Sequence, residues 1–169
     1  MQNRRWVVTG VSGSGKSTLG QLLAERLALP FVEGDDCHPP ANIAKMQAGQ
    51  PLGDTDRLPW LMRLQSHLIV ARQSGTGLVL TCSALKRSYR DLLRSGDTDA
   101  VFLHLHGNTA LFADRLAART GHFMPATLLP SQMHDLEPLA SGEGGLRLDP
   151  AHSPEQLLEQ IFRAFGEKI

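Results

Sequence analysis

The sequence predicts an α/β fold, a parallel sheet with helices on both faces, in a single domain. Three observations favour this fold class. Short apolar runs with strand character alternate along the chain with longer segments of helical period. A glycine-rich loop separates the first apolar run from the first helical segment. The 169 residues, 41% hydrophobic and 20% charged, suit one globular domain. Strands that alternate with helices form a three-layer sandwich.

Five segments have the apolar, β-prone composition of buried strands. They are Trp6–Thr9, Phe31–Glu33, Leu78–Cys82, Val101–Leu105 and Leu146–Asp149. The third is the clearest, because it follows two glycines, and the fifth is the weakest. Ligands in parallel sheets bind at the carboxyl ends of the strands. The turns at 10–17, 34–38 and 82–86 are therefore expected along one edge.

A helix is expected from Lys16 onward, because leucines recur at the spacing of one apolar helix face, and Pro30 ends it. These leucines are Leu19, Leu22, Leu23 and Leu27. Further helical segments fall at about 57–74, 85–94, 109–119 and 154–165. Such crossover helices make right-handed connections between parallel strands.

Composition and charge argue against several classes of protein. Lys plus Arg and Asp plus Glu are 17 each, so the chain is neutral, unlike a dedicated nucleic-acid binder. No apolar run approaches the roughly 18 residues of a membrane helix, and the N-terminal run is too short for a signal peptide. Cys37 and Cys82 are too few for a disulfide framework and lack metal-ligand spacing. A cytoplasmic location, without a membrane or nucleic-acid partner, is expected.

The glycine-rich loop matches the phosphate-loop pattern G-x-x-x-x-G-K-[ST] between a strand and a helix. It consists of Gly10, Val11, Ser12, Gly13, Ser14, Gly15, Lys16, Ser17 and Thr18. Glycines let backbone N–H groups surround phosphate oxygens at the positive end of a helix. Lys16 is expected at the β- and γ-phosphates, as a catalytic residue, and the Ser17 hydroxyl at Mg²⁺. A turn that only caps the helix is the less favoured interpretation, so a nucleoside triphosphate with magnesium is the predicted ligand.

Polar residues after the second strand predict the acceptor side of the site. Asp35 is the candidate general base, since a carboxylate at a strand end near the phosphate loop can accept a hydroxyl proton. Asp36 is more simply a turn or helix-cap residue. His38, Lys45 and Arg57 are candidates to bind an anionic or polyhydroxy acceptor, Arg57 through its bidentate geometry. A turn histidine and a helix-capping Asp56–Arg57 pair are the alternatives left open.

Basic residues also follow the third strand and the fourth. Lys86, Arg90 and Arg94 recur every four residues on one helix face, and Lys86 and Arg90 are the candidates for acceptor contacts. Ser83 stands where many phosphate-loop enzymes carry an aspartate that holds magnesium. Arg115, Arg119 and His122 belong to a cationic, glycine-interrupted segment suited to a closing lid. Compensation of the helix dipole is the alternative for part of that pattern.

These motifs together resemble the gluconokinases of the small phosphate-loop type, which are related to shikimate and nucleoside-monophosphate kinases. The matching segments are Gly10–Thr18, Gly34–Leu52, Asp56–Leu61, Cys82–Arg90, Gly121–Phe123, Leu129–Gln132 and Leu136–Pro138. The Cys82–Lys86 and Asp56–Leu61 segments are the most specific. The resemblance runs from about residue 6 to residue 138.

The resemblance implies a P-loop NTPase-like fold with a five-stranded parallel core, and one kinase domain over residues 1–169. Within it, the phosphate loop is 10–18, the acceptor-binding segment about 35–61 and the lid about 115–138. The resemblance also implies ATP- and Mg²⁺-dependent phosphorylation of D-gluconate to 6-phospho-D-gluconate, commonly by a homodimer.

The expected mechanism is in-line transfer from ATP, bound by the phosphate loop and Arg115, to a gluconate hydroxyl. Asp35 accepts or orients the proton, and Arg119 stabilises the transferring group. The acceptor contacts are drawn from His38, Lys45, Arg57, Lys86, Arg90 and His122. Three alternatives stay open: a kinase of another small hydroxyacid such as shikimate, a nucleotide-dependent switch, and a nucleic-acid end kinase. The sequence lacks the N-K-x-D motif of a GTPase switch, and few aromatics disfavour the last.

Overall fold

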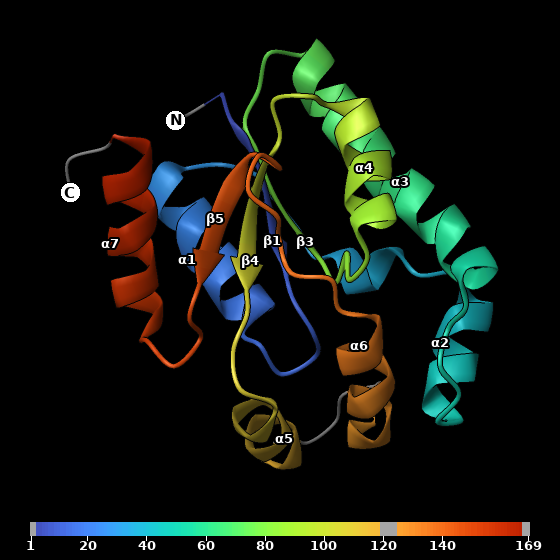
Figure 1. The fold of residues 1–169 in the computed structure, drawn as a ribbon. Helices are drawn as coiled ribbons and strands as arrows, with labels where there is room; N and C mark the ends of the chain where they lie inside the picture. Colours follow the sequence, from blue (N-terminus) through green and yellow to red (C-terminus); the bar gives the residue numbers. More distant parts are fainter. Residues whose placement is uncertain (1–2, 119–124, 167–169) are drawn as a thin grey trace.

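The computed structural model describes residues 3–118 and 125–166. They form a parallel five-stranded sheet in the order β2-β3-β1-β4-β5 (Figure 1). The strands are β1 Arg5–Thr9, β2 Phe31–Val32, β3 Leu78–Cys82, β4 Val101–Leu105 and β5 Gly145–Leu148. The predicted α/β fold class and its five strands are therefore confirmed, with shifts of one residue at the ends of β1, β2 and β5.

Helices cover both faces of this sheet. The α-helices are α1 Lys16–Leu27, α2 Pro40–Gln47, α3 Asp54–Gln73, α4 Arg87–Gly96, α5 Thr109–Ala117, α6 Leu129–Asp135 and α7 Pro154–Phe165. Two short 3₁₀ helices, η1 Gly34–Cys37 and η2 Ala126–Leu128, complete the described elements. In Figure 1, α3 and α4 lie on one side of the sheet, and α1 and α7 on the other.

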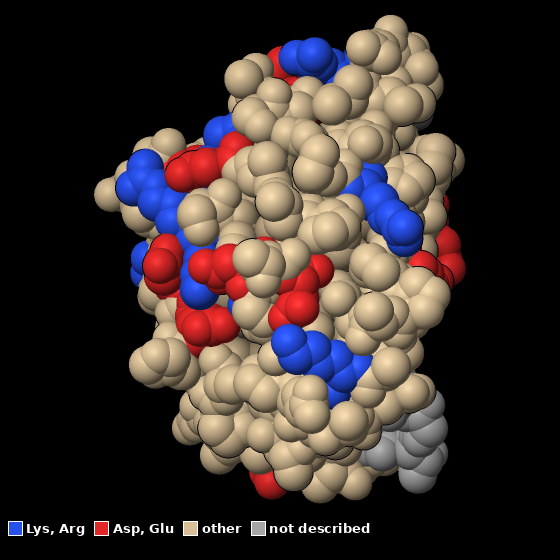
Figure 2. Space-filling view, turned by 90° about the vertical axis from the view of Figure 1, so that its right-hand side faces the viewer, with Lys and Arg blue, Asp and Glu red and all other residues tan. Residues whose placement is uncertain are grey.

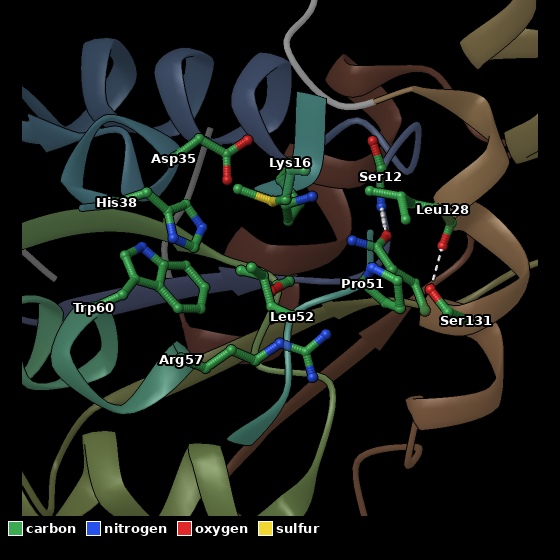
Figure 3. Close-up of a pocket in the computed structure, with 13 residues that line it drawn as sticks. Ser12, Lys16, Asp35, His38, Pro51, Leu52, Arg57, Trp60, Leu128 and Ser131 are labelled. Carbon is green, nitrogen blue, oxygen red and sulfur yellow. Dashed lines mark hydrogen bonds between the residues drawn. The ribbon is translucent and has the colours of Figure 1, made fainter. Parts of the chain in front are cut away.

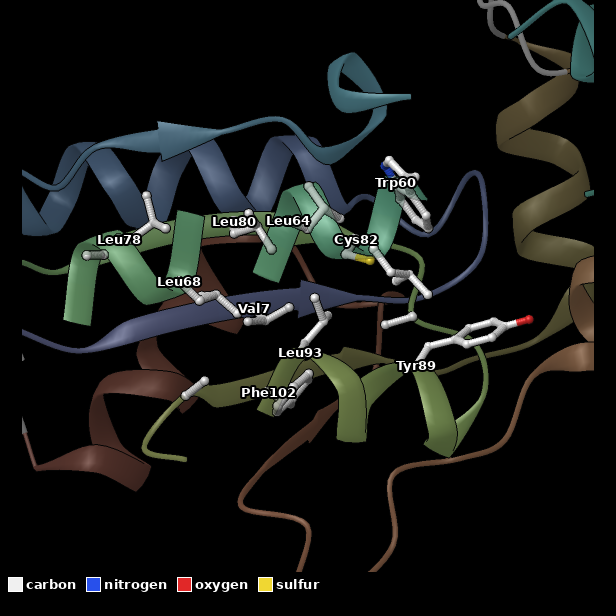
Figure 4. Close-up of a cluster of buried hydrophobic side chains, with 14 of the residues drawn as sticks. Val7, Trp60, Leu64, Leu68, Leu78, Leu80, Cys82, Tyr89, Leu93 and Phe102 are labelled. Atoms are coloured by element: carbon white, nitrogen blue, oxygen red, sulfur yellow. The ribbon is translucent and has the colours of Figure 1, made fainter. Parts of the chain in front are cut away.

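The central strand β1 is apolar on both sides because each side packs against helices. Val7 belongs to a core that includes Leu64 and Leu68 of α3 and Leu93 of α4 (Figure 4). Trp6 and Val8, on the opposite face, pack with a second core formed mainly by α1 and α7. All three β1 side chains are fully buried. The sheet is thus packed on both faces, and the loops described below follow the carboxyl ends of its strands.

Two helices of the structure were not predicted. α2 buries only Asn42 and Met46, and α6 buries only Leu129 and Gln132. Helices this short, with two inward residues each, leave no recognisable apolar period. Both helices lie near the carboxyl ends of the strands, and both contribute residues to the cavity described below.

Candidate active site

The phosphate loop joins β1 to α1 and depends on its glycines. Gly10, Gly13 and Gly15 have φ values of 145°, 79° and 96°, where residues with side chains are strained. A Cβ on Gly10 would also lie 2.7 Å from the carbonyl oxygen of Leu105. Lys16 is buried and its Nζ donates to the carbonyl of Val11 across the loop at 3.0 Å. No side chain caps the N-terminus of α1, so its first N–H groups face the loop, as an anion requires.

A cavity of about 270 Å³ lies beside this loop. Its lining includes Gly13–Gly15, Thr18, Arg115 of α5 and the segment before α7, through Pro150 and His152. Arg115 donates to the carbonyl of Ser14 at 3.4 Å and to that of Pro150 at 2.7 Å. The residue predicted to bind nucleotide therefore lies over the phosphate loop. Pro150 and His152 were not predicted, because nothing in their local sequence marks them.

A second, smaller cavity of about 30 Å³ also borders the loop (Figure 3). Ser12 and Lys16 line it from the phosphate loop, and Ser83 from the turn after β3. The remaining lining residues come from η1 and the turn after it, α2, the segment before α3, α3, η2 and α6. They are Asp35, His38, Met46, Pro51, Leu52, Arg57, Trp60, Leu128, Ser131 and Gln132. The three predicted acceptor residues Asp35, His38 and Arg57 are thus brought together, and they lie next to Lys16.

The position of Asp35 depends on a close approach of η1 to β3. Gly34 donates its N–H to Thr81 Oγ1 at 2.9 Å and accepts from Trp60 Nε1 at 2.7 Å. A Cβ at Gly34 would lie only 1.9 Å from the carbonyl oxygen of Thr81. Glycine is therefore required there, and it directs the next residue, Asp35, to the cavity, whereas Asp36 is exposed. This agrees with the assignment of Asp36 to a turn.

His38 is a neutral member of the site. Its ring stacks on Trp60 with centroids 4.1 Å apart, and its Nδ1 lies 3.3 Å from Asn42 Nδ2. Burial, and then the charge of Arg57, lower the pKa of His38 to about 4. At neutral pH its imidazole therefore offers hydrogen bonds to hydroxyl groups and no positive charge to a carboxylate.

Arg57 is a buried cation of the cavity, as is Lys16. Its Nη1 donates to Tyr89 Oη at 3.0 Å and to Asp135 Oδ2 at 2.9 Å. Tyr89 in turn donates to Asp54, which also accepts from Lys86 at 2.8 Å. Burial alone would lower the pKa of Arg57, but its bonds to Tyr89 and Asp135 outweigh burial and raise it. The guanidinium is therefore charged and held in a fixed orientation.

Three predicted acceptor residues do not line the cavity. Arg90 is fully buried and forms a two-bond ion pair with Glu143, 2.7 and 2.8 Å long. Its remaining nitrogen, Nη1, donates to backbone carbonyls, including that of Glu137 at 2.9 Å. The prediction that Arg90 contacts the acceptor is therefore wrong: burial and these partners leave it no donor to offer, and it anchors the chain after α6 to α4.

The other two residues are lysines in ion pairs near the surface. Lys45 donates to Asp56 at 2.7 Å and Lys86 to Asp54 at 2.8 Å, and neither lines the cavity. Hydrogen bonds to Asp54 raise the pKa of Lys86, and those from Lys86 lower that of Asp54. On the side of the molecule formed by α3 and α4, acidic and basic side chains are interspersed among uncharged ones (Figure 2).

Four further residues complete the comparison between the predicted site and the structure. Arg119 and His122, predicted as lid residues, lie outside the described residues. Cys82 is buried, and burial raises the pKa of its thiol to about 12, which suits a strand residue and not a nucleophile. Gln132, which had no predicted role, accepts a hydrogen bond from the Ser12 N–H at 2.7 Å. Only the Leu129–Gln132 similarity noted above pointed to it.

Comparisons with known proteins show the family to which the chain belongs. The family model described as shikimate kinase matches residues 12–137. The chain is 49% identical to a gluconokinase of Gluconobacter oxydans, over 98% of this chain and 93% of that protein. Two crystal structures are similar. A sugar kinase from Janibacter has 48% identity and a TM-score of 0.90, covering 95% of this chain and 92% of that one.

The second is a gluconokinase from Sinorhizobium meliloti, with 43% identity and a TM-score of 0.84, covering 94% of this chain and 89% of that one. Both structures share the fold over nearly the whole length of this chain. The range matched by the family model begins inside the phosphate loop, at Ser12, and includes Asp35, Arg57 and α6. The chain therefore belongs to the gluconokinase family, within the shikimate kinase-like phosphate-loop kinases.

Proposed function

We propose that this chain transfers the γ-phosphoryl group of ATP to the terminal hydroxyl of D-gluconate, producing 6-phospho-D-gluconate. One observation carries the proposal: two cavities border the phosphate loop, one lined by Arg115 and the other lined by Asp35 and Arg57. Figure 3 shows the second of them. A sugar acid has a carboxylate that can pair with Arg57 and hydroxyl groups, one of which can give its proton to Asp35. The family relationship to gluconokinases supports the same substrate.

In this proposal Lys16 and the N–H groups of the loop hold the β- and γ-phosphates. Arg115 stays beside the nucleotide, where it bridges Ser14 and Pro150. Arg57 binds the gluconate carboxylate, and neutral His38 bonds its hydroxyls. Asp35 accepts or orients the proton of the attacking hydroxyl, which approaches the γ-phosphorus in line.

Magnesium would be held by oxygen donors, which it prefers. Such donors are present in Ser17, at the start of α1, and in Asp35 and Ser83, which line the smaller cavity. The described residues contain no group of three or more His, Cys, Asp or Glu side chains that could hold a metal. In the proposal the phosphates and water complete the coordination of Mg²⁺, which neutralises charge on the triphosphate.

Arg119 and His122 keep their proposed roles, Arg119 at the transferring group and His122 at the acceptor, in a lid of about 115–138. The homodimer, the cytoplasmic location and the absence of a nucleic-acid partner also remain predictions. No helix in residues 3–118 or 125–166 is long and apolar enough to cross a membrane. Exposed Leu58 and Met62, one turn apart on α3, are large apolar side chains that a second copy would cover. Light scattering of the purified protein tests the dimer.

The test of the reaction is ATP consumption with D-gluconate, coupled to oxidation of the 6-phosphogluconate formed. Shikimate, glucose and a blank without acceptor are run beside it. Turnover with gluconate alone is expected. Turnover with shikimate instead would favour the alternative hydroxyacid, and ATP hydrolysis indifferent to every acceptor would favour a nucleotide switch.

The role of Asp35 is tested by Asp35→Asn, with Asp36→Asn as the matched control one residue away. Asp35→Asn is expected to lower kcat by a factor of about 10² to 10⁴, the usual contribution of general-base catalysis. The exposed control is expected to keep wild-type turnover. Equal turnover in the two variants would remove the assignment of Asp35 as the base.

A further inference from the structure

The carboxylate of Asp135 forms an ion pair with Arg57, the residue proposed to bind the carboxylate of the acceptor. Asp135 is the last residue of α6, and its Oδ2 lies 2.9 Å from Arg57 Nη1, across 78 residues of sequence. The Arg57 side chain is 7% exposed and that of Asp135 24% exposed. An acid from the chain itself is therefore placed at the buried guanidinium that lines the acceptor cavity.

The size of the cavity makes this contact significant. With the side chains placed as they are, about 30 Å³ of this cavity is open, enough for one or two water molecules. The neighbouring nucleotide cavity, at about 270 Å³, is nine times larger. A second carboxylate beside Asp135 on the same guanidinium would also meet like-charge repulsion in a site shielded from water. A carboxylate that binds Nη1 of Arg57 must therefore take the place of Asp135.

We propose that Asp135 is an internal competitor of the acceptor, so that gluconate binds by exchanging its carboxylate for that of Asp135 on Arg57. This inference rests on the proposed function and deepens it. It makes Asp135 a determinant of acceptor affinity, although no catalytic step involves it. The apparent affinity for gluconate is reduced by the fraction of molecules in which Asp135 holds Arg57.

Arg57 keeps its orientation when Asp135 leaves. Its Nη1 also donates to Tyr89 Oη at 3.0 Å, and its guanidinium lies over the Tyr89 ring, 5.5 Å from the centroid. Tyr89 is held in turn by its bond to Asp54. The exchange therefore replaces one carboxylate on a preorganised cation, without rebuilding the site.

The position of Asp135 favours its release. A carboxylate at the C-terminal end of a helix is opposed by the helix dipole, so Arg57 is its main stabilising partner. The side chain is partly exposed and can turn towards water and Lys86, whose charge already interacts with it. Gln132 keeps its bond to Ser12, and Leu129 stays packed with Val11 and Phe112. The helix can thus remain docked while Asp135 moves.

The test compares Asp135→Asn with the wild-type enzyme in the gluconate assay. Asparagine has the same shape and removes the charge, so the KM for gluconate is expected to fall by a factor of about 3 to 10. The kcat and the KM for ATP are expected to change little. Asp91→Asn, which removes a carboxylate from an exposed ion pair with Arg94, is the control for a general change of charge. A lower KM for one substrate is a gain that loss of structure does not produce.

A second measurement protects against a poorly folded variant. Asp135→Ser is assayed beside Asp135→Asn, and the shift of melting temperature caused by gluconate is compared between each variant and wild type. A larger shift in the variants is expected, because gluconate binds them more tightly. An unchanged KM and shift would show that Asp135 does not compete, and a raised KM would make it a residue that positions Arg57. Either result overturns the inference, whereas gluconate turnover by the wild-type enzyme separately decides the proposed function.

Discussion

The nucleotide side and the acceptor side of this site are built in different ways. The nucleotide side is made mainly of consecutive backbone, since Gly10–Thr18 forms a loop whose N–H groups are proposed to bind the phosphates. The acceptor side is made of side chains from several separate elements, among them Asp35, Arg57 and Gln132. The comparison teaches that phosphate recognition is local in sequence, whereas recognition of the acceptor depends on tertiary contacts. Changes remote from the phosphate loop should therefore affect the acceptor selectively.

The largest expected effect is on the free energy of unfolding, through the buried ion pair of Arg90 and Glu143. Glu143→Gln leaves buried Arg90 without its counter-charge, and breaking such a pair costs about 3 to 5 kcal/mol in the free energy of unfolding. Urea denaturation measures it, with exposed Asp91→Asn as the control, for which a change below about 1 kcal/mol is expected. The KM for gluconate of the folded variant should stay unchanged. A raised KM with normal stability would return Arg90 to the acceptor residues.

An intermediate effect is expected at the support of Asp35. Gly34→Ala places a Cβ 1.9 Å from the Thr81 carbonyl oxygen, so η1 must shift and carry Asp35 with it. A misplacement of about 1 Å lowers turnover by about 10²-fold. The affinity for ATP, measured by calorimetry, should be preserved. Gly53→Ala, where the nearest atom is 3.6 Å away and φ is −83°, is the control. An equal loss of ATP affinity would break the distinction between the two sides.

A last effect, about 2 kcal/mol for a single residue, is on stability in acid. Burial lowers the pKa of His38 and of His104 to about 4, below the usual 6.5. Below pH 6.5 the unfolded chain binds protons that the folded chain does not, so the free energy of unfolding falls as the pH falls towards 4. The loss between pH 7 and pH 5 is about 2 kcal/mol for each histidine. Urea denaturation at the two pH values measures it.

His38→Asn serves as the comparison for this acid effect, since asparagine does not titrate. The variant should lose less stability than wild type between pH 7 and pH 5. An identical loss in both proteins would show that His38 is protonated in the folded state. Because His104 lies in β4 and not in the acceptor cavity, the remaining pH dependence reports the sheet.

The contrast between the local phosphate loop and the acceptor side, built from separate elements, also explains which features could be predicted from the sequence. The alternating strands, the phosphate loop and the nucleotide ligand followed from local patterns, as did the position of Asp35 after β2. The wrong prediction concerns a long side chain whose partner lies far away in sequence. Arg90 lies on α4, but Glu143, 53 residues away, binds it. Lys86, the residue before α4, is paired in the same way with Asp54, 32 residues away, and its acceptor contact stays a prediction. Gln132 and Asp135 were missed for a second reason: the short helix α6 has no apolar period of its own, so nothing in the sequence predicted it.

The stack of His38 on Trp60 gives the protein a built-in optical reporter. The chain has two tryptophans, and Trp6 lies in the sheet, on the face covered by α1 and α7. Trp60 instead lines the acceptor cavity with an imidazole against its ring. Fluorescence of a Trp6→Phe protein therefore comes from the acceptor side alone, and the arrival of a sugar acid becomes visible as a change in emission, without turnover or label.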